Sequence, residues 1–232
     1  MMRNPLIIAL DVPNADQARA IVASLGDSVS IYKVGMELYA AEGMRFVPEL
    51  ISAGKHVFLD LKLYDIGETV KRATAVIAQT GVRFLTIHAN NPVMRAAADG
   101  RGGSNLQLLA VTVLTSWDQQ DLAEDGYSCQ LPDLIALRTR NAIRTGMDGL
   151  VCSPRDAAAV RKIVGPRIII VTPGVRSQSA AAGDQKRIAT PAEAIEAGAN
   201  YVVIGRQVTR SEDPRSEVAR ILEEISHPAV AR

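Results

Sequence analysis

Short runs of apolar, largely β-branched residues alternate with longer amphipathic stretches along the whole chain. Runs of about four to eight such residues between polar or glycine-rich segments are typical of buried strands, whereas longer stretches with a period of about 3.6 predict helices. The pattern predicts eight strands, at Leu6–Val12, Ser30–Met36, His56–Lys62, Phe84–Ala89, Gln107–Leu114, Gly149–Cys152, Arg167–Pro173 and Tyr201–Gly205.

A helical pattern follows each predicted strand. The helices are expected at Ala15–Leu25, from the second strand through Ala53, at Ile66–Gln79, from near Pro92, and at Pro132–Arg144, Pro154–Ile163 and Arg215–Ile225. Strand–helix alternation predicts a parallel sheet, and eight units in 232 residues favour a closed (β/α)₈ TIM barrel. A doubly wound open sheet is the alternative, but no GxGxxG motif follows the first strand. Because no linker or repeat divides the chain, one domain over residues 1–232 is expected.

Composition narrows the class of protein. Hydrophobic residues make up 47% and charged residues 22% of the chain, which is ordinary for a globular protein with a sizeable core. A net charge of +1 and an aromatic content of 4% give no support for nucleic-acid binding. No apolar run approaches the roughly 18 residues of a membrane span, and no signal-peptide pattern precedes Asp11. We therefore expect a cytoplasmic protein in which Cys129 and Cys152 are reduced packing residues.

Polar residues gather at one end of the predicted barrel, at the carboxyl ends of the strands, where TIM barrels carry their active sites. They are Asp11, Lys33, Asp60, Lys62, His88 and Thr115. Strand alternation directs Asp60 and Lys62 to the same face as Phe58. Ionisable side chains buried on three successive strands are costly unless they pair with one another. This pattern favours an active site over ordinary core packing.

Two of the polar residues have a structural interpretation as well. Asp65 begins an Asp-x-x-Glu pattern with Glu68, which equally fits a helix-capping box. His88 is interpreted as a hydrogen-bonded wall residue rather than a catalytic one. The three histidines are dispersed, and no Ser or Cys lies in a nucleophile elbow. The sequence therefore predicts neither a metal site nor a covalent nucleophile.

The last two strands predict a phosphate site. Strand seven ends in Thr172-Pro173-Gly174 and leads to Arg176, and strand eight ends in Gly205-Arg206. TIM barrels often hold phosphate with the loops after these two strands, where glycine exposes backbone N–H groups and arginine binds an anion bidentately. Residues 175–187, rich in Ser, Ala and Gly, form either a lid or an ordinary surface loop, and their basic ends favour the lid.

The residues around the third predicted strand resemble the signature of a known family. The pattern Asp60-x-Lys62-x-x-Asp65-Ile66-x-x-Thr69 is similar to the signature of the orotidine 5′-phosphate decarboxylase family. The segments ALDV, YKVG, TPGVR and DQKRIATPAEAIEAGANYVVIGR also resemble bacterial members, so that the resemblance covers nearly the whole chain. The departures are few: Tyr64 in place of His, Gly67 in place of Pro, and Asn90-Asn91 in place of small residues.

The resemblance implies a decarboxylation of orotidine 5′-phosphate to uridine 5′-phosphate, without metal or cofactor, in a homodimer with shared active sites. Lys62 would protonate C6 of the pyrimidine within an array of Lys33, Asp60, Lys62 and Asp65, and Asp65 and Thr69 would come from the neighbouring subunit. The implied substrate-binding residues are Asp11, Lys33, Asp60, Ile66, Thr69, Thr115, Pro173, Arg176, Gln185, Gly205 and Arg206.

Two other functions fit the predicted scaffold. Ribulose-phosphate epimerases and hexulose-phosphate synthases share phosphate-binding barrels but usually need a divalent metal. They resemble this chain less around strand three, where Asp65, Ile66 and Thr69 favour the decarboxylase. A catalytically silent barrel that binds a nucleotide is the second alternative, and the presence of Lys62 and Asp65 disfavours it.

Overall fold

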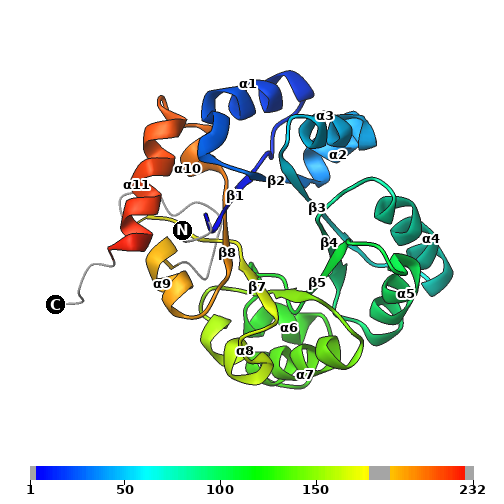
Figure 1. Ribbon diagram of the computed structural model, residues 1–232. Coiled ribbons are helices and arrows are strands. Elements are labelled where there is room, and N and C mark those ends of the chain that lie inside the picture. Colours follow the sequence, from blue (N-terminus) through cyan, green and yellow to red (C-terminus); the bar gives the residue numbers. More distant parts are fainter. Residues whose placement is uncertain (1–3, 178–188, 228–232) are drawn as a thin grey trace.

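A computed structural model of the chain describes residues 4–177 and 189–227, and it contains a closed barrel (Figure 1). Eight parallel strands pair in sequence order, and the last pairs with the first. They are β1 (Leu6–Ala9), β2 (Ile31–Gly35), β3 (His56–Leu63), β4 (Phe84–His88), β5 (Gln107–Val111), β6 (Gly149–Val151), β7 (Ile169–Thr172) and β8 (Tyr201–Ile204). The predicted (β/α)₈ TIM barrel is confirmed.

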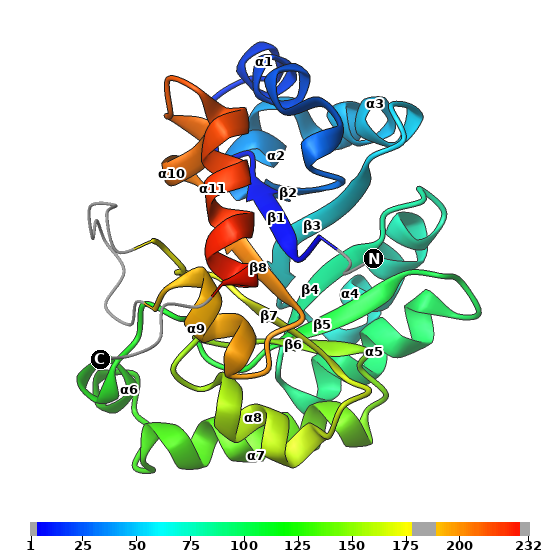
Figure 2. The same ribbon diagram turned by 60° about the vertical axis from the view of Figure 1, so that its left-hand side comes forward.

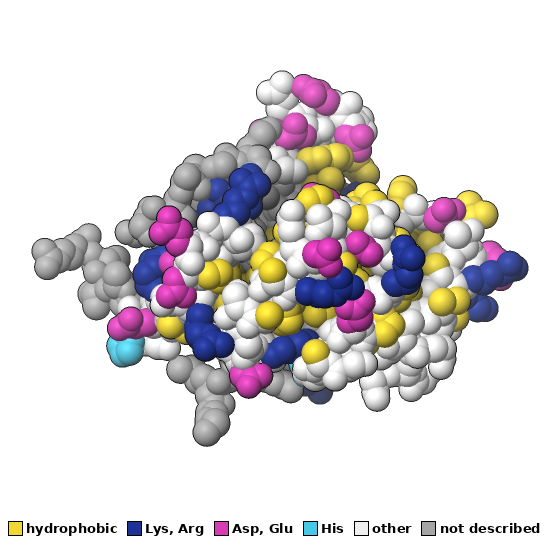
Figure 3. Space-filling view, turned by 90° about the horizontal axis from the view of Figure 1, so that it is seen from above, with side chains coloured by type: hydrophobic (Ala, Val, Ile, Leu, Met, Phe, Trp, Pro, Cys, Tyr) yellow, Lys and Arg dark blue, Asp and Glu magenta, His cyan; other side chains and the backbone are white. Residues whose placement is uncertain are grey.

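Helices form a ring around the strands (Figures 1 and 2). They are α1 (Ala15–Leu25), α2 (Met36–Glu42), α3 (Phe46–Ser52), α4 (Gly67–Ala78), α5 (Asn91–Arg101), α6 (Gln119–Glu124), α7 (Leu131–Arg144), α8 (Ala157–Val164), α9 (Pro191–Glu196), α10 (Arg206–Thr209) and α11 (Pro214–Ser226). None of the helices in the described ranges has the length and apolar character needed to cross a bilayer. The face seen in Figure 3 intersperses acidic, basic and apolar side chains.

Strand alternation separates the core into two apolar layers. Ile31, Phe58 and Phe84 belong to a cluster of inward-facing residues. Their neighbours Tyr32 and Leu59 belong to the larger cluster between the strands and the helices. The inner cluster fills only part of the barrel, because the next inward positions of β2 and β3 are charged. The alternation thus places polar side chains at the carboxyl end of the barrel, above a layer of buried apolar side chains.

One predicted helix is wrong. The helix expected from the second strand through Ala53 is broken into α2, a 3₁₀ turn at Gly43–Arg45, and α3. Gly43 adopts a φ of +60°, and its N–H donates to the carbonyl of Tyr39, which ends α2. The apolar periodicity continues across this break, so hydrophobic spacing alone did not reveal the cap.

Two short helices and several strand ends also differ from the prediction. In the polar stretch after β5, Asp118 and Asp121 form a capping box that begins α6. The turn α10 follows β8 directly. The predicted helix at Pro154 begins at Ala157, and β5 ends at Val111 rather than Leu114. Seven of the eight strands thus end earlier than predicted on the side where the polar residues gather, whereas β3 extends one residue further, to Leu63.

Helices α4 and α5 lie side by side in both ribbon views (Figures 1 and 2), and Gly100 lets them pack closely. A Cβ atom at Gly100 would collide with the backbone carbonyl of Lys71 and would lie 3.0 Å from the Cβ of Thr74. Because α4 begins two residues after Asp65, this close packing fixes the segment that follows β3.

We predict that Gly100→Ala lowers the free energy of unfolding by about 1–3 kcal/mol, because overpacking outweighs the better helix propensity of alanine. Chemical denaturation measures the effect. Gly103→Ala is the matched control, since no described atom lies within 4 Å of the place its Cβ would take. Equal stability of the two variants would contradict a close approach at Gly100.

Candidate active site

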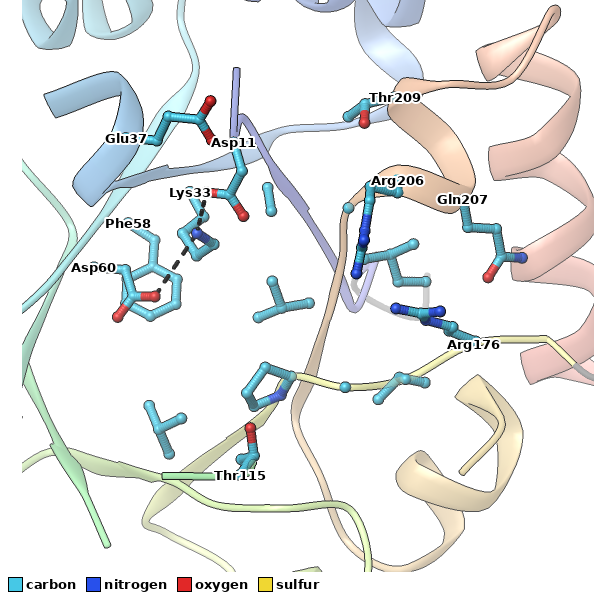
Figure 4. A pocket seen from close by; sticks show the side chains of 18 of the residues that line it. Asp11, Lys33, Glu37, Phe58, Asp60, Thr115, Arg176, Arg206, Gln207 and Thr209 are labelled. Carbon is cyan, nitrogen blue, oxygen red and sulfur yellow. Dashed lines mark hydrogen bonds and ion pairs between the residues drawn. The ribbon is translucent and has the colours of Figure 1, made fainter. Parts of the chain in front are cut away.

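A pocket of about 550 Å³ opens at the carboxyl ends of the strands (Figure 4). Its lining combines the ends of β1, β2 and β3, the loop after β5, and the segments after β7 and β8. Nine of the residues expected in the site line it: Asp11, Lys33, Asp60, Lys62, Thr115, Pro173, Arg176, Gly205 and Arg206. The topology therefore brings together residues that are separated by up to nearly the whole chain.

Four charged residues form an alternating array on one wall of the pocket. The ammonium group of Lys33 lies 2.7 Å from Oδ1 of Asp11 and 3.8 Å from Oδ2 of Asp60. Nζ of Lys62 donates a hydrogen bond of 2.9 Å to the same Oδ2 of Asp60. Lys33 is only 7% exposed, so its charge depends on these carboxylates. Mutual pairing positions all four groups before any ligand binds.

Gly35 provides the space for the Lys33–Asp11 pair. A Cβ atom at this position would lie 2.6 Å from Oδ1 of Asp11 and 2.7 Å from Nζ of Lys33. Any side chain there would displace both charged groups. The glycine of the YKVG segment is therefore part of the array, although it carries no chemistry of its own.

Lys62 reaches the pocket from an unusual backbone conformation. Its φ is +49°, the one positive value among the described non-glycine residues, and the pairing of β3 with β4 shifts register between Leu59 and Leu63. Such a conformation costs about 1–3 kcal/mol and persists only where the surroundings enforce it. Simple strand alternation correctly predicts the inward direction of Asp60, but it does not predict this bulge.

Thr86 on β4 holds the bulge in place, and it was not predicted. Its buried hydroxyl accepts a 2.8 Å hydrogen bond from the N–H of Lys62 and donates a 2.9 Å bond to Oδ1 of Asp60. The backbone of one charged residue and the side chain of the other are thus tied to a single group. A signal was present in the sequence, because Thr86 is the polar residue between the inward-facing Phe84 and His88.

The array changes the protonation of Asp60. Burial by itself would raise the pKa of its carboxyl, but Lys33, Lys62 and the hydrogen bonds from Lys62 and Thr86 together lower that pKa below its ordinary value. Burial and the cations of Arg138 and Lys62 lower the pKa of His88. His88 is therefore neutral at neutral pH.

The predicted residues that follow β3 lie outside this pocket. Asp65, Ile66 and Thr69 are exposed and are not among the lining residues. The capping-box interpretation of Asp65 is wrong: Ile66 is the N-cap of α4, and Asp65 accepts a hydrogen bond only from the N–H of Ile66, within the described contacts. Glu68 pairs with Arg72 instead. Gln185 lies outside the described residues.

The departures from the family pattern have local explanations. The ring of Tyr64 meets the ring of His88 edge-on, with the centroids 5.4 Å apart. Gly67 is the first residue of α4, where a Cβ would meet only the Cβ of Ala96, at 3.6 Å, so the glycine is not needed for space. Asn90 precedes α5, and its carbonyl accepts the N–H of Met94.

Two arginines form the opposite wall. Arg176 follows β7, and Arg206 begins α10 directly after Gly205; Figure 4 shows both across the pocket from Lys33 and Asp60. This wall suits an anion, because guanidinium groups bind phosphate oxygens bidentately. Further lining residues were not predicted: Glu37, Gln207, Thr209 and Arg210. Three of these, Gln207, Thr209 and Arg210, follow the Gly205-Arg206 segment within about one turn, so their nearness in sequence to that segment was the available signal.

Within residues 4–177 and 189–227, no three or more His, Cys, Asp and Glu side chains are grouped so that they could hold a metal ion. The carboxylates of Asp11 and Asp60 are instead paired with lysines.

The fold and the pocket define a (β/α)₈-barrel protein in which two arginines lie opposite a partly buried array of charges. The model of the orotidine 5′-phosphate decarboxylase / HUMPS family matches residues 4–221, and the chain belongs to this family.

Individual proteins similar to this chain are consistent with its membership of the family. The chain is 52% identical over 224 residues to an orotidine 5′-phosphate decarboxylase of Rhodopseudomonas palustris strain HaA2, covering 97% of this chain and 95% of that protein. It is 49% identical over 221 residues to one of a Caulobacter species, covering 95% and 96%. The crystal structure of the Lactobacillus acidophilus orotidine 5′-phosphate decarboxylase superimposes with a TM-score of 0.85 at 33% identity, covering 97% of this chain and 100% of that chain.

We predict that Asp60 stays ionised below its ordinary pKa of 3.8. Because its pKa is lower in the folded chain than the value of about 3.9 in the unfolded chain, ionised Asp60 stabilises the fold above that pH. This contribution is lost as the pH falls through the folded pKa. Carbon NMR of the carboxyl groups measures the midpoint, with Asp60→Asn used to assign the resonance. A midpoint at or above 3.8 would contradict the paired geometry.

Proposed function

We propose that the chain converts orotidine 5′-phosphate to uridine 5′-phosphate and carbon dioxide, the last step of uridine monophosphate synthesis. The observation that carries this proposal is the arrangement of one pocket, in which the Lys33–Asp60–Lys62 array faces Arg176 and Arg206. The array suits a reaction that develops negative charge on a ring carbon, and the arginines suit a 5′-phosphate.

The two walls orient the substrate. The phosphate binds Arg206, Arg176 and the backbone at Gly205, and the pyrimidine reaches towards Lys62, Thr115 and Pro173. The ribose lies between these groups, where its hydroxyls meet Asp11 and Lys33. The distances of 2.7 Å and 3.8 Å from Lys33 to Asp11 and Asp60 support this assignment, because they fix the lysine at the centre of the array.

Lys62 supplies the proton. As the bond between C6 and the carboxylate carbon breaks, its electron pair stays on C6 and carbon dioxide leaves. An N–H of the Lys62 ammonium then transfers its proton to C6, and solvent reprotonates the amine. The hydrogen bond of 2.9 Å to Asp60 holds Nζ in place before the transfer. Such preorganised charge requires no reorganisation when the carbanion forms.

The phosphate wall contributes to turnover as well as to affinity. Loss of carbon dioxide from an unactivated ring carbon is difficult, and binding energy from a remote group can be used to hold the reacting group against the array. The phosphate is the largest such group on the substrate. Arg206 and Arg176 thus contribute to catalysis indirectly: by holding the phosphate, they position the pyrimidine against the array.

We further propose a homodimer in which Asp65, Ile66 and Thr69 complete the partner subunit's site. These residues are exposed and do not line their own chain's pocket. The surface around them exposes large apolar side chains: Tyr64 is 66% exposed, Ile66 73% and Val76 66%. Val76 follows Thr69 by seven residues and therefore shares its face of α4. An exposed apolar surface of this kind supports burial against another chain.

A cytoplasmic location is also proposed. Cys129 and Cys152 are not joined by a disulfide, as expected for a reducing compartment. The hexulose-phosphate synthases, the alternative on the same scaffold, usually need a divalent metal, and the first test below separates them from decarboxylation.

Purified protein is expected to deplete the ultraviolet absorbance of orotidine 5′-phosphate equally with and without a chelator. Lys62→Ala is expected to lower kcat by at least about 1,000-fold, because it removes both the proton donor and a cation of the array. Lys162→Ala, an exposed lysine on α8, is the control and should retain wild-type turnover. Loss of activity in chelator, or an active Lys62→Ala variant, would contradict the assignment.

A hybrid dimer tests the shared site. When Lys62→Ala and Asp65→Ala chains carry different tags, the dimer purified through both tags is expected to have about half the wild-type activity, because one of its two sites is intact. Each variant alone should be inactive. If Asp65 acted within its own chain, neither site of the hybrid would be complete and no activity would return. A monomeric wild-type protein would also refute the shared site.

A further inference from the structure

Ser177 and Gln207 connect the two segments that carry the arginines of the pocket. Ser177 directly follows Arg176, and Gln207 directly follows Arg206. The N–H of Ser177 donates a 3.1 Å hydrogen bond to Oε1 of Gln207, and Nε2 of Gln207 donates a 2.9 Å bond to Oγ of Ser177. Figure 4 places Gln207 beside the two arginines, on the side away from Lys33.

The pair is anchored further on helix α11. Oγ of Ser177 donates a 2.6 Å hydrogen bond to Oε2 of Glu224, and Nε2 of Gln207 also donates to Oε1 of Glu217, at 2.7 Å. Ser177 is 3% exposed, and its hydroxyl both donates and accepts. A buried polar network with its bonds satisfied is rigid, because any rearrangement leaves a group unpaired. The segment after β7 is thereby tied to α10 and α11.

The arginines need such a restraint. Arg176 and Arg206 carry like charges on one wall of the pocket, and they belong to segments whose linked residues, Ser177 and Gln207, are 30 positions apart. Arg176 has a further tether, since its N–H donates to the carbonyl of Ala189 at 3.0 Å. That bond joins Arg176 to Ala189, before α9, but it does not connect Arg176 to the segment that carries Arg206. Bidentate binding of a phosphate requires the two groups at a fixed spacing.

We propose that Ser177 and Gln207 are positioning residues that set the spacing of Arg176 and Arg206 for a phosphate group. They act through the arginines, and no contact with the reacting atoms is assigned to them. The inference rests on the proposed function only in taking the phosphate to be that of a 5′-nucleotide.

The test compares a nucleotide with its nucleoside. Dissociation constants for uridine 5′-phosphate and for uridine are measured for wild type, Ser177→Ala, Gln207→Leu and the double variant. Each single variant is expected to bind uridine 5′-phosphate about 10-fold more weakly, as for the loss of one hydrogen bond, and uridine within about twofold of wild type. The double variant should bind about as weakly as either single variant, because the two side chains form one unit.

Helix α11 offers a matched control. Glu224→Ala and Glu223→Ala each remove one negative charge, but Glu224 is the one that accepts from Ser177. Only Glu224→Ala should weaken binding of uridine 5′-phosphate beyond about twofold. Equal weakening for nucleotide and nucleoside, unchanged nucleotide binding, or a wild type that does not prefer the nucleotide would overturn the inference.

These measurements do not depend on turnover. A wild-type protein that fails to decarboxylate orotidine 5′-phosphate, but whose preference for nucleotide over nucleoside falls in the variants, refutes the proposed function and supports the positioning role. An active enzyme whose variants keep that preference refutes the positioning role alone.

Discussion

The burial of one ammonium group determines how the mouth of this barrel is built. Lys33 is 7% exposed in the middle of β2, and a buried charge without partners would cost several kcal/mol. Asp11 and Asp60 supply those partners from the two neighbouring strands, at 2.7 Å and 3.8 Å. Gly35 must then lack a side chain, because a Cβ would occupy the space of the Lys33–Asp11 pair. Residues of three strands thus depend on a single buried cation.

Lys62 is held in place by a hydrogen bond to its backbone as well as by charge pairing. Lys62 takes a left-handed backbone conformation, and Thr86 compensates by accepting its N–H while donating to Asp60. The same hydroxyl therefore stabilises the strained backbone and orients the carboxylate that pairs with Lys62. Because strain and charge are balanced by one buried group, β3 and β4 cannot shift relative to each other without loss of both.

The sequence predicted the barrel and most of the pocket because both follow from local patterns. Strand alternation gives the inward direction of Asp60 at once, and the segments after strands seven and eight carry recognisable glycines and arginines. What it missed depends on contacts between distant segments: the bulge at Lys62 is stabilised from β4, and the link between Ser177 and Gln207 spans 30 positions. The role of Asp65 could not be predicted from local pattern either, because no pattern within one chain indicates which subunit's site its carboxylate completes.

The two walls of the pocket are held together in different ways, because one carries charges of opposite sign and the other carries charges of the same sign. The array is made of opposite charges, which attract, so strands alone can hold it at distances of 2.7–3.8 Å. The arginines carry like charges, and they lie on a loop and a four-residue helix. We assign their spacing to the hydrogen bonds between Ser177 and Gln207, which are anchored in turn on Glu224 and Glu217 of α11. Ion pairs between neighbouring strands thus hold the charged array, whereas a hydrogen-bond network outside the pocket connects the segments that carry the two arginines.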